Sequence, residues 1–306
     1  MIEVRELNSK KISNLKKKQD KIFEKYSFDE NMDKINWTKI RKIINGAVRI
    51  IKLPSGFHLK TYKKGKMRFE FITPKKKTNE NIILYFHGGG FVTGSAILSR
   101  DFTIALSDIT GSCVCSVDYP LAPENKIVEC YDIISSIYDL LTIRYPNSNI
   151  ILSGTSAGGC LALGLAEKLI RDKKKLPSAL ILNSPLLDMT GKYKIVNELN
   201  DGIVKPGCKK GMAKLFLGKY KKSNYLASPL LYSNRYLPRC MISIDNNETL
   251  FTDSYVLYNK YIENDIECNL VIYKNAFHGF QKLGKKTKET IELLHMINDF
   301  INKSQV

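Results

Sequence analysis

The chain has 306 residues, 43% of them hydrophobic and 10% aromatic, which provides for a sizeable core and excludes a disordered chain or a small disulfide scaffold. Its formal net charge of +18 permits nucleic acid or an acidic membrane surface as a partner. The lysines, however, are spread along the chain in short runs, and no nucleic-acid-binding motif accompanies them. We therefore interpret the charge as solvated surface and expect no nucleic-acid partner.

The cysteines and the start of the chain bear on the compartment. Seven cysteines form neither a disulfide framework nor paired C-x-x-C ligand sets. The opening stretch "MIEVRELNSKK" lacks the apolar centre of a secretory signal, and no apolar run approaches the length of a membrane span. We expect a cytoplasmic protein with no metal, no cofactor and no stable membrane insertion.

Residues 1–50 are rich in lysine, lack strand alternation and carry apolar residues at helical spacing. The first such pattern includes Ile12, Leu15, Ile22, Phe23 and Tyr26, and a second follows around Trp37. The spacing predicts a helical segment that packs on the rest of the chain.

From about residue 56, short apolar runs alternate with helical patterns. The runs are "MRFEFI", "NIILYF", "CVCSVDY", "NIILSG", "ALILNS", "CMISID" and "CNLVIY". Such alternation indicates a mostly parallel sheet with helices on both faces, and the first pair of runs is a candidate antiparallel entry. Between Ser184 and Leu237 the alternation lapses, which predicts a functional insertion such as a lid.

A glycine-flanked serine follows the run "NIILSG". Gly154, Ser156 and Gly158 match G-x-S-x-G, in which a nucleophilic serine sits on a sharp strand-to-helix turn between residues that need to be nearly free of side chain. An anion cradle and an ordinary tight turn are the alternatives. The cradle is the weaker one, because the lysine followed by Ser or Thr of a phosphate loop is missing.

Three consecutive glycines follow the run "NIILYF". Gly88, Gly89 and Gly90 expose backbone N–H groups without steric cover, which suits the stabilisation of an oxyanion. A bare glycine turn is the plainer interpretation. The position directly after a strand, upstream of the serine motif, favours the oxyanion interpretation.

A serine nucleophile needs a base, and the chain offers four histidines. His278 follows a strand in a loop and is the preferred base, whereas structural or exposed positions are expected for His58, His87 and His295. A carboxylate must orient the base, and the candidates after "CMISID" are Asp245, Glu248 and Asp253. Glu248 is preferred because it falls in the turn between the strand and the next helical pattern, which gives the order Ser, Glu, His along the chain.

Several motifs in this order resemble the hormone-sensitive lipase family of esterases, within the α/β-hydrolase superfamily. The resemblance covers roughly residues 65–300 and is carried by "HGGGFVTGS", "DYPLAPE", "GTSAGG", "SPLLDMTG", "LASPL", "NETLFTDS" and "FHGFQ". It implies an α/β-hydrolase fold of about eight mostly parallel strands with helices on both faces. It also implies a helical cap made by residues 1–50 and an insertion at about 188–232, on a catalytic domain spanning residues 51–306.

The resemblance implies roles for individual residues. Ser156 would attack the ester carbonyl, His278 would take and return the proton, and Glu248 would orient His278. The main-chain N–H groups of Gly88, Gly89 or Gly90 and of Ala157 would hold the oxyanion. In "DYPLAPE", Asp118 and Tyr119 are expected to stabilise the glycine loop.

The expected activity is a serine carboxylesterase that acts on short- to medium-chain esters through an acyl-enzyme. An amidase or arylamide deacetylase uses the same residues and remains an alternative. A non-catalytic small-ligand receptor on this fold and a membrane-surface lipase anchored by the basic N-terminal segment are less favoured. A small ester is the expected partner, and a homodimer is possible.

Overall fold

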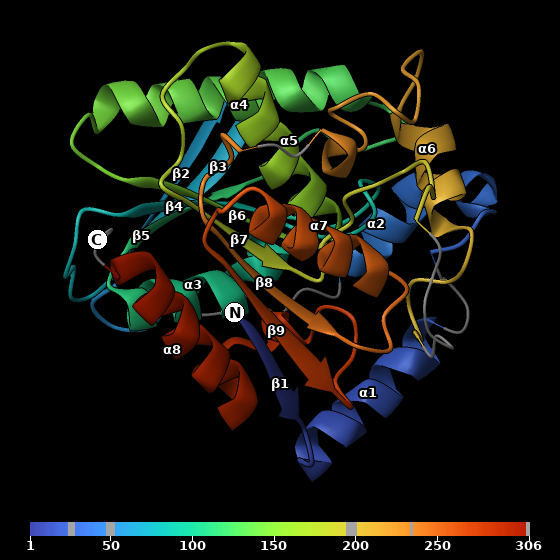
Figure 1. The fold of residues 1–306 in the computed structure, drawn as a ribbon, viewed down its shortest axis with the longest axis horizontal. Coiled ribbons are helices and arrows are strands. Elements are labelled where there is room, and N and C mark those ends of the chain that lie inside the picture. Colours follow the sequence, from blue (N-terminus) through green and yellow to red (C-terminus); the bar gives the residue numbers. More distant parts are fainter. Residues whose placement is uncertain (24–27, 47–52, 194–200, 233–234, 304–306) are drawn as a thin grey trace.

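Nine strands form one sheet at the centre of the computed structural model, which describes residues 1–23, 28–46, 53–193, 201–232 and 235–303 (Figure 1). The strand order is β1-β9-β8-β7-β6-β4-β5-β3-β2. The strands are β1 (Ile2–Glu6), β2 (His58–Lys64), β3 (Met67–Thr73), β4 (Ile82–Phe86), β5 (Cys113–Val117), β6 (Ile150–Thr155), β7 (Ala179–Asn183), β8 (Cys240–Asp245) and β9 (Cys268–Lys274). The mostly parallel sheet is confirmed, with nine strands instead of about eight.

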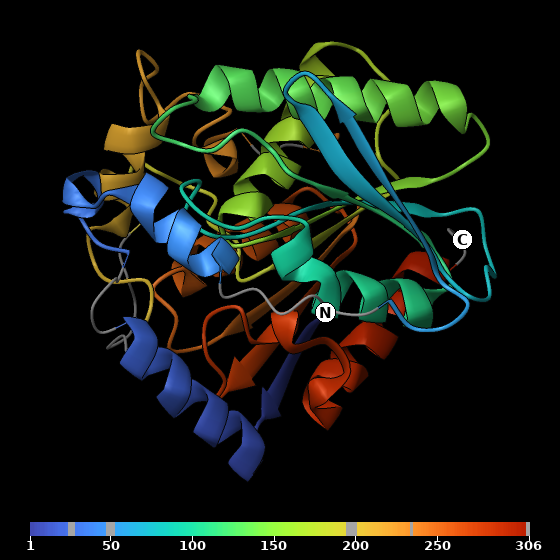
Figure 2. The same cartoon turned by 180° about the vertical axis from the view of Figure 1, so that it is seen from behind.

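The central strands are predominantly apolar because both faces of the sheet are covered. Every residue of β4 is buried: Leu84 points into one core cluster, and Ile83 and Tyr85 point into the other. The first cluster includes α4, α5 and α7, and the second includes α3 and α8, so helices cover both faces as predicted (Figures 1 and 2). These helices are α3 (Arg100–Thr110), α4 (Ile127–Arg144), α5 (Ala157–Arg171), α7 (Phe251–Glu263) and α8 (Lys288–Asn302).

The N-terminal segment differs from the helical prediction at its start. Residues Ile2–Glu6 form β1, which pairs in parallel with β9 at one edge of the sheet. The amide of Leu270 donates to the Met1 carbonyl at 2.8 Å, and the amide of Leu7 donates to the Lys274 carbonyl at 2.9 Å. Hydrogen bonding to β9 makes this stretch a strand, although the side chains of Ile2 and Val4 are exposed.

The opposite edge of the sheet contains the antiparallel strands. The run "MRFEFI" forms β3, which runs antiparallel to β2 and to β5 and does not pair with β4. Strand β2, "HLKTYKK", was not expected from the sequence, because nearly all its side chains are exposed and no apolar alternation marks it.

Three helices lie on the same side of the molecule, where the parallel strands end (Figures 1 and 2). They are α1 (Lys10–Phe23) and α2 (Trp37–Gly46) from the N-terminal segment and α6 (Cys208–Phe216) from the insertion. A bridge between Phe28 and Val204 joins the two segments. Tyr26 and residues 24–27, 47–50 and 194–200 of the predicted cap segments lie outside the described residues.

Short 3₁₀ turns complete the connections. They are η1 (Met32–Lys34), η2 (Ile97–Ser99), η3 (Pro229–Leu231) and η4 (Phe280–Lys286). All seven cysteines are buried and unpaired. Within the described part of the chain, none of the helices combines the length and the hydropathy that a bilayer crossing requires.

Candidate active site

Ser156 stands on a strained turn between β6 and α5. Its φ of 55° and ψ of −120° lie in a region that non-glycine residues rarely occupy. The turn is held by main-chain bonds: the Ser156 amide donates to the Asn183 carbonyl at 2.9 Å, and the Leu186 amide donates to the Ser156 carbonyl at 3.0 Å. The backbone therefore presents the hydroxyl at the end of β6 and at the start of a helix.

The flanking glycines permit a close approach of main chains. A Cβ atom on Gly154 would lie 2.1 Å from the carbonyl oxygen of Gly158. A Cβ atom on Gly158 would lie 2.0 Å from the carbonyl oxygen of Phe86, at the end of β4. Any side chain at either position would push the turn away from the sheet, which is the physical reason for G-x-S-x-G here.

Ser156, His278 and Glu248 form a hydrogen-bonded row across the ends of three strands. Nε2 of His278 lies 3.0 Å from Oγ of Ser156, and Nδ1 lies 2.6 Å from Oε2 of Glu248. Because an ionised carboxylate only accepts, Nδ1 carries the proton and Nε2 is free to accept the serine proton. The exposed fractions of Ser156, His278 and Glu248 are 5%, 6% and 1%, so the row is shielded from bulk water.

Opposing effects set the pKa of His278. Burial alone would lower the pKa, but the charge and hydrogen bond of Glu248 and the charge of Asp201 act in the other direction, and the pKa is raised above its ordinary value of 6.5. The nearby Lys282 lowers the pKa in part. The arrangement therefore favours the imidazolium form that a proton transfer from Ser156 creates.

Glu248 is fixed by neighbours on its other oxygen. Oε1 accepts from the Ser184 hydroxyl at 2.7 Å and from the Asp245 amide at 3.0 Å. Nε2 of Gln281 donates to the Ser184 hydroxyl at 3.1 Å. Ser184 and Gln281 were not singled out in the sequence, although "SPLLD" and "FHGFQ" contain them, because their role depends on contacts that are distant along the chain.

The predicted oxyanion donors surround Ser156 on two sides. Within the described residues, the amides of Gly88, Gly89, Gly90 and Ala157 donate to no protein acceptor. Ala157 begins α5, whose dipole adds positive potential at this point. A Cβ atom on Gly88 would lie 3.2 Å from Cβ of Ser156, whereas one on Gly90 would lie 3.0 Å from the Phe28 ring. Gly88 thus lies against the serine, and Gly90 packs against the N-terminal segment.

The residues after β5 hold the glycine loop, as predicted for "DYPLAPE". The Tyr119 hydroxyl donates to the His87 carbonyl at 2.8 Å, and Oδ1 of Asp118 accepts from the Ala96 amide at 2.6 Å. His87 stacks on Tyr119 with ring centroids 4.1 Å apart, and Nδ1 of His87 donates to the Gly88 carbonyl at 2.8 Å. Burial lowers the pKa of His87 to about 4, so this histidine is neutral and structural.

The remaining candidates occupy other positions. His58 and His295 are exposed, on β2 and α8. Asp245 accepts from the amides of Asn247 at 3.0 Å and Ala276 at 2.7 Å, and burial raises its pKa to about 6. Asp253 pairs with Lys209 at 2.6 Å. Glu248 is therefore the carboxylate at His278 among the three that the sequence offered.

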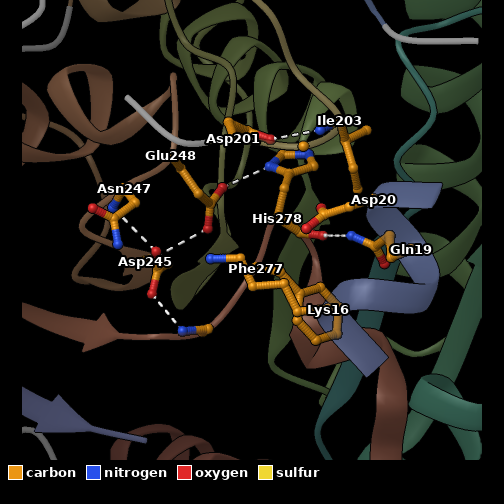
Figure 3. A pocket seen from close by; sticks show the side chains of 12 residues that line it. Lys16, Gln19, Asp20, Asp201, Ile203, Asp245, Asn247, Glu248, Phe277 and His278 are labelled. Atoms are coloured by element: carbon orange, nitrogen blue, oxygen red, sulfur yellow. Dashed lines mark hydrogen bonds and ion pairs between the residues drawn. The ribbon is translucent and has the colours of Figure 1, made fainter. Parts of the chain in front are cut away.

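A fourth carboxylate, that of Asp201 in the insertion, lies beside His278 (Figure 3). Ligand-capable atoms of Asp201, Glu248 and His278 lie within 4.8 Å of one another. Such a cluster matches the donors of a cation site, but Nδ1 of His278 carries a proton bonded to Glu248, and Asp201 accepts backbone amides. The three groups therefore already have hydrogen-bond partners within the protein.

Residues 83–282 of this chain match the family described as the alpha/beta hydrolase fold. An esterase of Acinetobacter venetianus is 30% identical over 72% of the chain and 74% of that protein. The esterase LipU of Mycobacterium tuberculosis is 28% identical over 72% of the chain and 77% of that protein. The crystal structure of a hormone-sensitive lipase from a metagenome library superposes with a TM-score of 0.82 at 25% identity, covering 94% of this chain and 97% of that one.

Proposed function

The chain belongs to the α/β-hydrolase fold family, and we propose that it hydrolyses small carboxylic esters through an acyl-enzyme formed on Ser156. Its matches confirm the resemblance to hormone-sensitive lipase esterases and make it a carboxylic ester hydrolase. The observation that carries the residue assignment is the row from Oγ of Ser156 through the imidazole of His278 to Glu248, with distances of 3.0 and 2.6 Å.

Acylation begins when Ser156 Oγ attacks the ester carbonyl carbon and Nε2 of His278 takes the hydroxyl proton. The carbonyl oxygen becomes an oxyanion, which the amides of Gly88, Gly89 and Ala157 stabilise, with Gly90 as a further candidate donor. The imidazolium, stabilised by Glu248, then gives its proton to the departing alkoxide. An alcohol leaves, and the acyl group remains on Ser156.

Deacylation repeats these steps with water as the nucleophile. His278 takes a proton from the water, the same amides hold the second oxyanion, and Ser156 leaves with the proton returned by His278. The products are a carboxylic acid and the free enzyme. One base therefore serves both halves of the cycle.

We propose that the part of the N-terminal segment that follows β1, together with the insertion at about 188–232, forms a cap that restricts substrates to short and medium acyl chains. Two hydrogen bonds from Arg41, to the Val92 carbonyl at 2.8 Å and to the Ala122 carbonyl at 2.9 Å, tie the N-terminal part to the glycine-loop region. Nε2 of Gln19 donates to the His278 carbonyl at 3.1 Å. Contacts on both sides of Ser156 support a confined site; a p-nitrophenyl ester series from acetate to laurate is expected to peak at or below octanoate.

The decisive experiment is covalent labelling with a fluorophosphonate. The protein is incubated with the probe and its intact mass is measured, with Ser156→Ala as the variant and Ser153→Ala as a control that removes a nearby hydroxyl on β6. We expect one adduct on the wild type and on the control, none on S156A, and hydrolysis of p-nitrophenyl butyrate to follow the label. A wild-type protein without adduct and without hydrolysis would contradict the assignment.

Amide hydrolysis is the second activity to test, because the same residues serve both reactions and differ mainly in protonation of the leaving group. Comparing p-nitrophenyl acetate with p-nitroacetanilide measures the preference. We expect the ester to react faster. Turnover of either compound also contradicts a receptor without catalysis, which the presence of His278 at Ser156 already disfavours.

Compartment and partners complete the proposal. The seven unpaired, buried cysteines support a reducing compartment and hence the cytoplasm. We propose no nucleic-acid partner, because the lysines are spread along the chain without a nucleic-acid-binding motif, and some pair with carboxylates, as Lys174 does with Asp139 at 2.6 Å. Light scattering would test the homodimer, and liposome flotation would test the membrane-surface alternative.

A further inference from the structure

Asp201 is a buried carboxylate that the mechanism above does not use. It is 8% exposed and belongs to the insertion, whereas Ser156, Glu248 and His278 follow strands of the sheet. Figure 3 shows it next to the imidazole of His278, approaching from a different segment than Glu248. A negative charge this close to His278 acts on the protonation of the imidazole.

The hydrogen bonds of Asp201 join the insertion to the turn that carries Glu248. Oδ1 accepts from the amides of Ile203 and Val204, both at 2.9 Å. Oδ2 accepts from the amide of Thr249 at 3.2 Å, and Thr249 directly follows Glu248. The Thr249 hydroxyl donates back to the Val204 carbonyl. The carboxylate thus bridges two segments that are far apart along the chain.

We propose that Asp201 is a positioning residue for this esterase: carried by the cap insertion, it fixes the turn of Glu248 and places a second negative charge beside the His278 imidazole. The inference rests on the proposed function and deepens it. The position of the Asp201 charge beside His278 then depends on how the insertion packs on the N-terminal segment, because Val204 is also bridged to Phe28.

The effect of this charge has a definite sign. A negative charge near the imidazole stabilises its protonated form, so Asp201 raises the pKa of His278 together with Glu248. Removing the Asp201 charge lowers the pKa of His278 and destabilises the imidazolium that forms during acylation. The charged groups around His278 come from four segments and are Glu248, Asp245, Asp201, Lys282, Lys16 and Asp20.

A plain turn-capping role is the competing account, because an aspartate that accepts amides two and three residues ahead is common in loops. Such a role affects stability alone. The two accounts separate in the pH dependence of kcat/KM, which reports the free enzyme's base. Asp188 supplies a matched control: it is buried at the start of the same insertion and accepts the amides of Thr190 at 2.8 Å and Lys192 at 3.1 Å.

The test compares D201N, D201E and D188N with the wild type on p-nitrophenyl butyrate across pH, together with thermal unfolding. In D201N we expect the midpoint of the kcat/KM profile to move to lower pH and the plateau to fall about tenfold, the cost of one hydrogen bond to a charged group. D201E keeps the charge and is expected to restore most of the midpoint. D188N is expected to lower the unfolding temperature without moving the midpoint.

A D201N midpoint equal to that of the wild type overturns the proposal, whatever happens to the unfolding temperature. If D201N does not fold, the midpoint of D201S is compared with that of the wild type instead, because serine retains a small acceptor for the Ile203 amide. Fluorophosphonate labelling of the wild type keeps the two proposals apart. No label refutes the esterase assignment, whereas normal labelling with an unmoved midpoint refutes the role of Asp201 alone.

Discussion

The charge state of His278 governs the site at the scale of single residues. The imidazole must be neutral to take the proton of Ser156, and its pKa is raised above 6.5 because Glu248 and Asp201 outweigh the effect of burial. Protonation of His278 therefore lowers activity already at mildly acidic pH. The side chain of Lys282 folds back over the turn after His278, since a Cβ atom on Gly279 would lie 2.8 Å from its Cε atom.

The first prediction concerns this balance. We expect kcat/KM of the wild type to rise with pH in a single step whose midpoint lies above 6.5, because the folded-state pKa of His278 is raised. Lys282 lowers that pKa, so K282Q is expected to move the midpoint to higher pH. Stopped or continuous assays with p-nitrophenyl butyrate, corrected for spontaneous hydrolysis, measure both midpoints. An unchanged or lower midpoint in K282Q contradicts the prediction, and K274Q, at the exposed last residue of β9, serves as a control.

The motif residues of the site could be predicted from the sequence, whereas the residues that hold them in position could not. Ser156, Glu248 and His278 each follow an apolar run, and parallel strands bring such positions to one edge of a sheet. Asp201, Ser184 and Gln281 act through contacts across the fold, and no local pattern marks them. Asp201 in particular belongs to the stretch where strand and helix patterns lapse.

At the scale of elements, the contact between α5 and β4 sets the turn that presents Ser156. The amino end of α5 approaches the carboxyl end of β4 so closely that Gly158 has no room for a methyl group. Further along α5, a Cβ atom on Gly164 would lie 2.0 Å from the hydroxyl oxygen of Tyr131. The first contact is with main chain, and the second is with a side chain.

This difference yields the second prediction. G158A forces α5 away from β4, so we expect fluorophosphonate labelling to fall at least about a hundredfold, together with a loss of about 2 kcal/mol in stability from overpacking. G164A is expected to lose similar stability and to retain labelling, because the Tyr131 hydroxyl contacts α5 at Cys160 and Gly164, beyond the residues of the serine turn. Labelling rates and thermal unfolding measure the two effects. Normal labelling of G158A would show that the turn tolerates a side chain.

Elements with buried faces were predictable, and those with exposed faces were not. Strand β4 reads as an uninterrupted apolar run because it lies between two cores. The edge strands β1 and β2 carry mostly exposed side chains, so their pairing with β9 and β3 leaves little trace in hydrophobic periodicity. The basic composition of residues 1–50 favoured the helical interpretation over β1.

At the scale of the whole molecule, the N-terminal segment belongs to the same body as the sheet. Phe28 and Trp37 stack with ring centroids 5.8 Å apart and join the core cluster that also contains β4. The Trp37 indole donates to the Met32 carbonyl at 2.8 Å. At the other end of the segment, β1 covers one edge of β9, the strand that leads to His278. We therefore expect the cap segment and the sheet to unfold together.

The last prediction concerns β1. Deleting residues 2–6 exposes the edge of β9, whose free N–H and C=O groups then offer a template for another chain. We expect a lower unfolding temperature and self-association on light scattering. The loss of esterase activity is expected to be small, because β1 contributes no residue to the active site. V4K is the matched variant, because Val4 is 54% exposed and the backbone pairing persists; its stability should stay within about 0.5 kcal/mol of the wild type. A deletion variant that remains monomeric with an unchanged transition would mean that β1 contributes little to the sheet.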